Sequence, residues 1–152
     1  GKKYSYAISQ SFKEKLLNPE IGIYLAMIES EFCPCIQAPT GALGMFQLAS
    51  SSGKAYGLQT YQLASPDNPD ERCAPVKASK ATAGFFDELL RKKRINGNYG
   101  RDANGILLAI AAYNSGETGL KRNIKATEAI LGESLVTFCF LRASRMASIS
   151  AW

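Results

Sequence analysis

Glu29 is the residue whose type and setting most directly suggest chemistry, because it interrupts an apolar helical pattern. Four residues recur at helical spacing and predict a buried stripe: Ile21, Leu25, Ile28 and Phe32. At about 100° per residue, Glu29 lies roughly 60–70° to the side of this stripe, which would leave its carboxyl half desolvated. Desolvation raises a carboxyl pKa, as a general acid working near neutral pH requires. The same pattern also fits a surface glutamate that extends into solvent.

Glu31 is the nearest other carboxylate, and it lies about 160° from Glu29 around the same helix. The two side chains therefore cannot address one bond, and we expect Glu31 to face solvent unless the helix ends early. Residues 32–46 contain no Asp or Glu. This part of the chain thus offers a single candidate carboxylate.

The elements that would position Glu29 are helices and one irregular segment. We expect its helix to run from Pro19 to about Phe32, with Asn18 as the N-cap. A short first helix, capped by Ser9 or Ser11, should end near Asn18. Four breakers then indicate an irregular loop or short hairpin: Pro34, Pro39, Gly41 and Gly44.

The remainder of the sequence is also helical in pattern. We expect a short helix over 45–56 and a longer one that ends near Arg94. Residues 106–112 are apolar on every face, which predicts a central helix wrapped by the others and ending at Ser115-Gly116. A final helix should begin near Ser134. Without repeats or linkers, the pattern predicts one all-α domain over residues 1–152.

Composition and charge limit the class of protein. The 152 residues are 46% hydrophobic and 20% charged, as in an ordinary folded domain. A net charge of +5 suits an anionic partner such as nucleic acid, a membrane surface or a cell wall. We do not expect nucleic acid, because aromatic residues are not interleaved with the basic ones. No apolar stretch approaches the roughly 18–20 residues of a membrane span.

The start of the chain bears on localisation. Residues 1–4 lack the apolar core of a signal peptide. Either export needs no such signal or this is a mature form with its leader removed, which we favour. We therefore expect an exported protein, periplasmic or secreted.

The cysteines are four in number: Cys33, Cys35, Cys73 and Cys139. An even number fits two disulfides in an oxidising compartment. Cys33 and Cys35 are too close to pair easily, so each should join Cys73 or Cys139, in one of two arrangements. Free buried thiols are the alternative. We expect neither a metal nor an organic cofactor, because the chain has no histidine and no Cys-x-x-Cys knuckle.

Three segments together resemble successive motifs of the soluble lytic transglycosylases, relatives of goose-type lysozyme. The segments are Glu29-Ser30-Glu31-Phe32, residues 41–48 (GALGMFQL) and residues 111–116 (AAYNSG). The family patterns read approximately E-S-x-F, G-A-x-G-L-M-Q and A-Y-N-x-G, in this order. The likeness covers about residues 19–122. It implies a lysozyme-like fold, all-α or at most α+β, with a hairpin or loop beside an active-site cleft.

The resemblance implies a role for each matching polar residue. Glu29 would protonate the glycosidic oxygen between N-acetylmuramic acid and N-acetylglucosamine in peptidoglycan, then act as a base. Ser30 would help to position the reacting groups, and Gln47 would hydrogen-bond to the glycan. Tyr113 would donate to Glu29 or to the sugar, and Asn114 would brace that corner.

Some positions depart from the family pattern. Met45 and Phe46 replace the usual Leu-Met pair and could contact the glycan, although such residues are more often core. Ala38 stands where a glycan-contacting serine is common. The Cys-Pro-Cys sequence at 33–35 is also unusual. These differences affect the fine substrate preference rather than the reaction class.

The resemblance favours a mechanism with one carboxylate. Most glycosidases use two, but in lytic transglycosylases the substrate's own acetamido oxygen attacks, and the muramyl 6-hydroxyl closes a 1,6-anhydro ring. A second carboxylate, such as Asp67, Asp102 or Glu117, could instead position water. The enzyme would then be a true lysozyme. A related alternative is action on deacetylated glycan.

Two readings without catalysis stand beside these. A wall-binding module would keep the fold without cleavage, but the set of Glu29, Gln47 and Tyr113 speaks against it. A basic inhibitor or membrane-surface protein would leave the three motifs unexplained. We expect a monomer whose partner is the peptidoglycan glycan strand.

Overall fold

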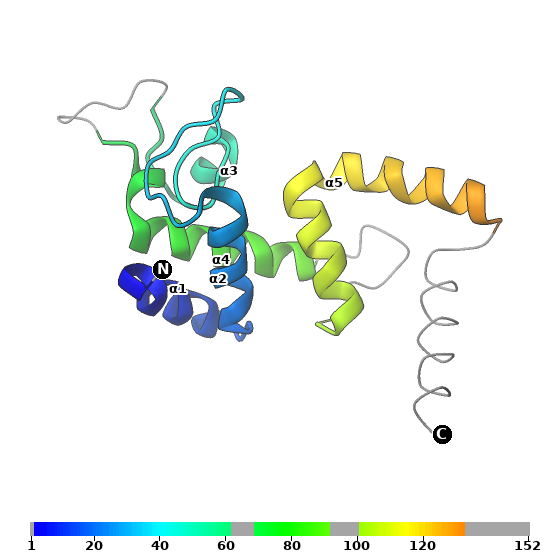
Figure 1. Cartoon of the computed structure of the whole chain (residues 1–152), viewed down its shortest axis with the longest axis horizontal. Helices are drawn as coiled ribbons and strands as arrows, with labels where there is room; N and C mark the ends of the chain where they lie inside the picture. The colour runs from blue at the N-terminus through cyan, green and yellow to red at the C-terminus, as the bar shows by residue number, and fades with distance from the viewer. Residues whose placement is uncertain (1, 62–68, 92–100, 133–152) are drawn as a thin grey trace. The chain divides into compact units, whose positions relative to one another are not determined.

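The protein is built from α-helices joined by turns (Figure 1), and its computed structural model describes residues 2–61, 69–91 and 101–132. The helices are α1 (Lys2–Glu14), α2 (Pro19–Ser30), α3 (Ser50–Ala55), α4 (Pro75–Arg91) and α5 (Ala103–Leu131), and a 3-10 turn, η1 (Glu71–Cys73), precedes α4. These ranges contain no β-strand, only two isolated antiparallel bridges. The all-α class is confirmed.

The chain divides into two compact units, residues 1–88 and residues 89–152. The first contains α1, α2, α3, η1 and most of α4, and the second contains α5. The single domain predicted over residues 1–152 stays a prediction. None of the helices described is both long enough and apolar enough to cross a membrane.

Helices α1 and α2 pack closely against each other. Ile8 and Phe12 of α1 are fully buried, and a Cβ added at Gly22 of α2 would come within 2.6 Å of both side chains. The start predicted for α1 is wrong, since the helix already begins at Lys2. Ser11 lies inside it, where its hydroxyl donates to the Ala7 carbonyl instead of capping the helix.

Helix α2 begins as predicted, with the Asn18 side chain accepting from the Glu20 N–H at 3.0 Å. It ends at Ser30, two residues early, because Glu31 and Phe32 adopt left-handed conformations (φ 52° and 65°). The predicted stripe is wrong at Ile28, which is 69% exposed.

The buried face of α2 is formed by two apolar and two small residues: Ile21, Gly22, Leu25 and Ala26. At about 100° per residue, Glu29 follows one turn later within roughly 10° of the centre of that face. The sequence pattern misplaced the face because it gave weight to large residues. The close approach of α1 instead favours Gly22.

The helix predicted over 45–56 is shorter in the structure, where α3 begins only at Ser50. Residues 45–48 belong to a turn in which the main chains of Leu43 and Leu48 bond to each other in both directions. Gln47 lies in the left-handed region (φ 47°), which a continuing α-helix does not allow.

Helix α5 begins after the Asp102 cap and contains a break at Gly116 (φ 71°, ψ 155°), which confirms the predicted stop at Ser115-Gly116. Its helical continuation to Leu131 was not predicted. Burial is one-sided: Ala109 is buried, whereas Leu107, across the helix, is 64% exposed. The predicted enclosure on every face is therefore wrong for the helix as described. The predicted helix end at Arg94 and the predicted helix from Ser134 lie outside the described residues.

Candidate active site

Glu29 lies in the last turn of α2, with its side chain half-buried. Burial desolvates its carboxyl and raises its pKa above the ordinary value. The expected half-desolvated position of this carboxyl is confirmed, whereas its catalytic role stays a prediction. Glu31 is exposed, also as expected.

The end of α2 is a sharp turn directly after this acid. The Glu31 N–H donates to the Met27 carbonyl and the Phe32 N–H to the Ala26 carbonyl, both at 3.0 Å. The bond from Phe32 spans six residues, one more than the outer bond of a Schellman helix end, and it closes around two left-handed residues, Glu31 and Phe32. The chain therefore leaves the helix axis two residues after Glu29 and enters the segment that leads to residues 41–48, here called the motif loop.

Ser30 connects α2 to the motif loop. Its hydroxyl donates to the Met45 carbonyl at 2.8 Å and lies 3.4 Å from the Ala26 carbonyl. The hydroxyl next to Glu29 thus fixes the distance between the helix end and the motif loop. The substrate-positioning role predicted for Ser30 stays a prediction.

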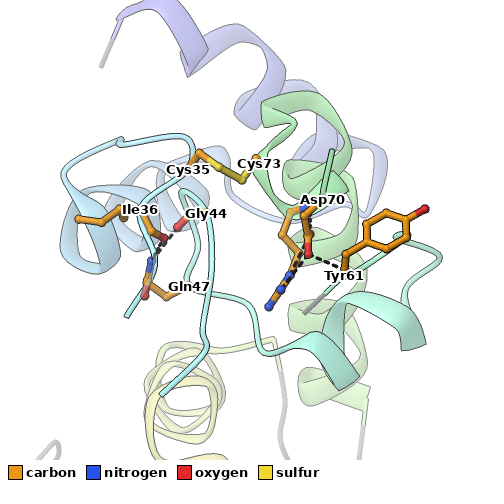
Figure 2. The surroundings of a disulfide bond; sticks show 8 residues. Cys35, Ile36, Gly44, Gln47, Tyr61, Asp70 and Cys73 are labelled. Atoms are coloured by element: carbon orange, nitrogen blue, oxygen red, sulfur yellow. Dashed lines mark hydrogen bonds and ion pairs between the residues drawn. A yellow bond between two sulfur atoms is a disulfide. The ribbon is translucent and has the colours of Figure 1, made fainter. Parts of the chain in front are cut away.

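Gln47 is held by the main chain around it (Figure 2). Its Nε2 donates to the carbonyls of Ile36 at 3.0 Å and Gly44 at 2.9 Å. Both amide hydrogens are therefore committed, which leaves Oε1 as the atom suited to accept a hydrogen bond from a ligand. The predicted glycan contact of Gln47 would then have the glycan as donor.

Met45 and Phe46 are core residues, as the more usual role of their types predicted. Both are 0% exposed. A contact of either side chain with a glycan would require it to leave the core. Their side chains anchor the motif loop in the core.

The motif loop approaches the chain near η1 very closely. Gly44 has a φ of 86°, and a Cβ at this position would lie 2.1 Å from the Arg72 carbonyl oxygen. Glycine is therefore required at Gly44 both for its conformation and for the close approach. The family motif's second glycine thus has a local structural cause.

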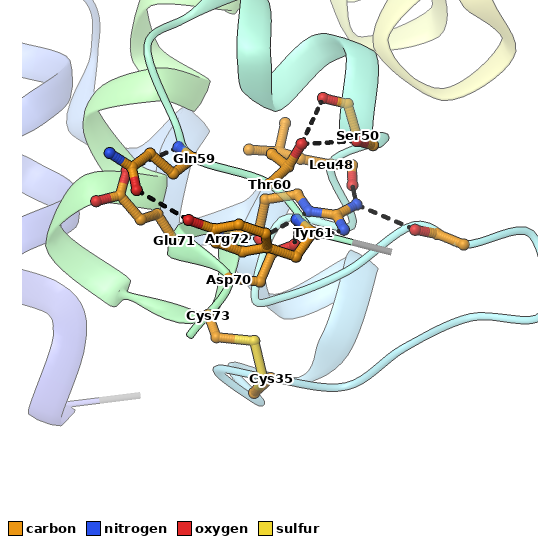
Figure 3. A network of polar contacts seen from close by, with 11 residues as sticks. Cys35, Leu48, Ser50, Gln59, Thr60, Tyr61, Asp70, Glu71, Arg72 and Cys73 are labelled. Atoms are coloured by element: carbon orange, nitrogen blue, oxygen red, sulfur yellow. Dashed lines mark hydrogen bonds and ion pairs between the residues drawn. A yellow bond between two sulfur atoms is a disulfide. The ribbon is translucent and has the colours of Figure 1, made fainter. Parts of the chain in front are cut away.

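Asp70 and Arg72 form a buried ion pair beside the motif loop (Figure 3). Burial alone would raise the pKa of Asp70, but the Arg72 side chain, the N–H groups of Tyr61 and Arg72, and the Arg72 charge together lower it. Nothing in the sequence pattern predicted this pair. Its signal is an acid and a base two residues apart, which is too common to be specific.

A disulfide joins Cys35 to Cys73, with the Cα atoms 4.5 Å apart (Figure 2). This pairing agrees with one of the two predicted arrangements. Cys33 is exposed and has no disulfide partner among the described residues. Cys139 lies outside them, so the second predicted disulfide stays a prediction.

Tyr113 and Asn114 lie in α5, in the second unit, just before the break at Gly116. Tyr113 is half-buried and Asn114 is exposed. Their roles toward Glu29 and the glycan stay predictions. Among the described residues, no group of three or more His, Cys, Asp or Glu side chains could hold a metal ion.

A cavity in the first unit lies away from Glu29. It measures about 600 Å³ and is lined by the end of α1, residues 56–59, Glu71 and α4. A second cavity of about 450 Å³ lies around Tyr61 and Cys73. Glu29, Ser30 and Gln47 line neither of them. Neither of these two cavities defines the candidate site, whose case rests on the setting of Glu29 and on the motifs.

Comparison with known proteins places the chain in a family. Residues 6–135 match the transglycosylase SLT domain, and the chain belongs to this family. It is 30% identical over 126 residues to the membrane-bound lytic murein transglycosylase D of Escherichia coli strain K12, a match that covers 83% of this chain and 25% of that protein. It is 36% identical over 94 residues to the peptidoglycan transglycosylase gp16 of Escherichia phage T7, covering 61% of this chain and 6% of that protein. The chain thus spans a quarter or less of the length of these relatives.

Proposed function

We propose that this chain cleaves the glycan strands of peptidoglycan between N-acetylmuramic acid and N-acetylglucosamine, with Glu29 as its acid and base. The observation that carries the proposal is the half-buried carboxyl of Glu29, whose pKa is raised at the first position of the family's motif. The names of the relatives, murein and peptidoglycan transglycosylases, support the same substrate.

The proposed reaction is a lytic transglycosylation. Protonated Glu29 gives its proton to the glycosidic oxygen as the bond to the anomeric carbon breaks, and the substrate's acetamido oxygen attacks that carbon. The carboxylate then removes the proton of the muramyl 6-hydroxyl, whose oxygen attacks the anomeric carbon and displaces the acetamido oxygen. The product is a 1,6-anhydro end, and Glu29 is protonated again. One carboxyl group suffices for both transfers.

Hydrolysis is the second candidate, and it needs a carboxylate that positions water. Asp70 is unsuited, because it is buried and bonded to Arg72. Asp102 is committed as the cap of α5, where it accepts from the Gly105 N–H at 2.7 Å. Glu117 is half-buried in α5, and Asp67 lies outside the described residues. A deacetylated glycan, which cannot supply the acetamido oxygen, would favour this route.

The test is replacement of Glu29 by Gln, with Glu31→Gln as the matched control two residues away. We expect Glu29→Gln to lower the release of muropeptides from purified sacculi by at least about 10²-fold, the usual share of a general acid. Glu31→Gln should leave release unchanged because that side chain is exposed. Circular dichroism checks that both variants fold. Release by Glu29→Gln at the wild-type rate would contradict the assignment.

Product masses separate the two chemistries and the non-catalytic alternative. Anhydro ends indicate transglycosylation, and ends heavier by one water indicate hydrolysis. Comparison of acetylated with deacetylated sacculi tests the substrate preference. Binding to sacculi without any release would instead support a wall-binding module.

Export to the periplasm or the exterior, and a monomeric state, complete the proposal. Peptidoglycan lies outside the cytoplasmic membrane, and the Cys35–Cys73 disulfide agrees with an oxidising compartment. Thiol alkylation of the protein isolated from its native compartment tests the first point. Sedimentation tests the second.

A further inference from the structure

The motif loop carries Gln47 in a conformation that requires support from outside. Gly41, Gly44 and Gln47 all adopt left-handed conformations, with φ of 85°, 86° and 47°. For Gln47, which has a side chain, this region is unfavourable. The motif loop contains no regular strand, and its internal support comes from isolated bridges such as the reciprocal pair of bonds between Leu43 and Leu48. Contacts with another segment add to this support.

Arg72 supplies those contacts at both ends of the motif loop. Its Nη1 donates to the carbonyl of Gly41 at 3.1 Å and to that of Leu48 at 3.0 Å, which are the first and last residues of the loop. Its own carbonyl oxygen lies against Gly44, in the middle. One residue thus contacts the start, the centre and the end of the motif loop.

Arg72 is itself held in one orientation. Its Nε donates to Asp70 Oδ1 at 3.0 Å and its Nη2 to Asp70 Oδ2 at 2.8 Å, while the Tyr61 N–H donates to Oδ2 at 2.8 Å (Figure 3). Arg72 is 3% exposed. A two-pronged bond from a planar guanidinium fixes direction as well as distance. A lysine side chain cannot form this two-pronged bond.

Two hydrogen bonds connect the motif loop to residues of the candidate site. Met45, in the loop, accepts from the hydroxyl of Ser30, the neighbour of Glu29. The carbonyl of Gly44 accepts from the Gln47 side chain and so directs its amide. A shift of the motif loop would therefore displace Gln47 and loosen the end of α2.

We propose that Arg72, oriented by Asp70, is a positioning residue that sets the motif loop, and through it Gln47, for binding the glycan. This inference rests on the proposed function. The Cys35–Cys73 disulfide does not replace it, because that bond joins the chain before the motif loop to the residue after Arg72 and includes none of residues 41–48.

The test uses Arg72→Lys and Arg72→Met, assayed on soluble uncrosslinked glycan strands for KM and kcat separately. We expect Arg72→Met to lower kcat/KM on the order of 100-fold, the effect of misplacing a site from a distance, mainly through a higher KM. Arg72→Lys should be intermediate. Arg122→Lys is the matched control, because Arg122 is exposed on α5, and it should match the wild type.

A second variant separates positioning from stability. Asp70→Leu combined with Arg72→Met removes both buried charges, so no unpaired charge is left and the fold can be retained. It still lacks the donors to Gly41 and Leu48. We expect its KM to stay raised although its free energy of unfolding matches that of the wild type. A return of KM to the wild-type value would overturn the proposal.

Combination with Gln47→Ala shows whether Arg72 acts through that residue. If it does, Arg72→Met should add little to the loss that Gln47→Ala causes alone. Independent, fully additive losses would contradict the inference. An inactive wild type would instead contradict the proposed function, so the two failures are distinguishable.

Discussion

The raised pKa of Glu29 is the property on which its proposed role depends. The carboxyl is partly withdrawn from water by its place on the buried face of α2, and burial is the cause of the shift. A surface glutamate at the same point of the sequence would be ionised near neutral pH. The difference arises within two residues, since Glu31, just past the end of α2, is exposed.

This shift gives the enzyme a defined dependence on pH. The general acid must be protonated, so kcat/KM should be highest below the raised pKa of Glu29 and fall as pH rises through it. We expect the decline to begin above the ordinary pKa of a glutamate. A pH–rate profile on soluble glycan strands measures it. If kcat/KM instead completed its decline at pH values below the ordinary pKa of a glutamate, Glu29 would be excluded as the acid.

The same carboxyl should also affect stability. Its folded pKa is higher than its unfolded pKa, so its contribution is fully present below the unfolded value and is lost as pH rises through the folded value. The unfolding temperature of Glu29→Gln should therefore exceed that of the wild type at pH 7 and approach it at pH 4. The opposite order would contradict the direction of the shift.

At the scale of elements, the motif loop depends on one close backbone approach. Gly44→Ala should lower the free energy of unfolding by about 1–3 kcal/mol from its left-handed φ alone, and by more from the clash with the Arg72 carbonyl. Gly57→Ala is the control, since Gly57 has φ 82° with nothing within 4 Å of an added Cβ. Urea unfolding of both measures the difference. Equal losses would contradict a tight contact at Gly44.

The helices could be predicted from the sequence where local signals decide them. Asn18 and Pro19 gave the start of α2, and Gly116 gave the break in α5. The buried face of α2 could not be predicted, because Ile28 is larger than Gly22 yet is exposed. Which face packs depends on how closely α1 approaches, and that distance is not encoded within α2.

The candidate site was predictable in part, for a similar reason. Glu29 and Gln47 stand in motifs that mark them by residue type. Arg72 has no such mark, because its partners Gly41 and Leu48 offer backbone carbonyls, which every residue carries, at separations of 31 and 24 residues. Only the folded structure shows that both carbonyls accept hydrogen bonds from the guanidinium of Arg72.

At the scale of the whole molecule, the family match extends over residues 6–135 and so includes parts of both compact units. The disulfide lies within the first unit and closes a separation of 38 residues. Cross-linking at that separation removes conformational freedom from the unfolded chain, not from the folded one. Its effect should therefore appear in the unfolding equilibrium rather than in the shape of the site.

Replacement of Cys35 and Cys73 together by Ser should lower the free energy of unfolding by up to about 4 kcal/mol, the chain-entropy value for a loop of this length. Both cysteines are replaced so that Cys33 cannot pair with the one left behind. Denaturant unfolding of the wild type without and with reductant, beside the double variant, measures the loss. The reduced wild type should match the variant in the same reductant, and both should keep the KM of the oxidised enzyme, because Arg72 still binds Gly41 and Leu48. A raised KM would mean that the disulfide, and not Arg72, positions the motif loop, and would contradict the proposal.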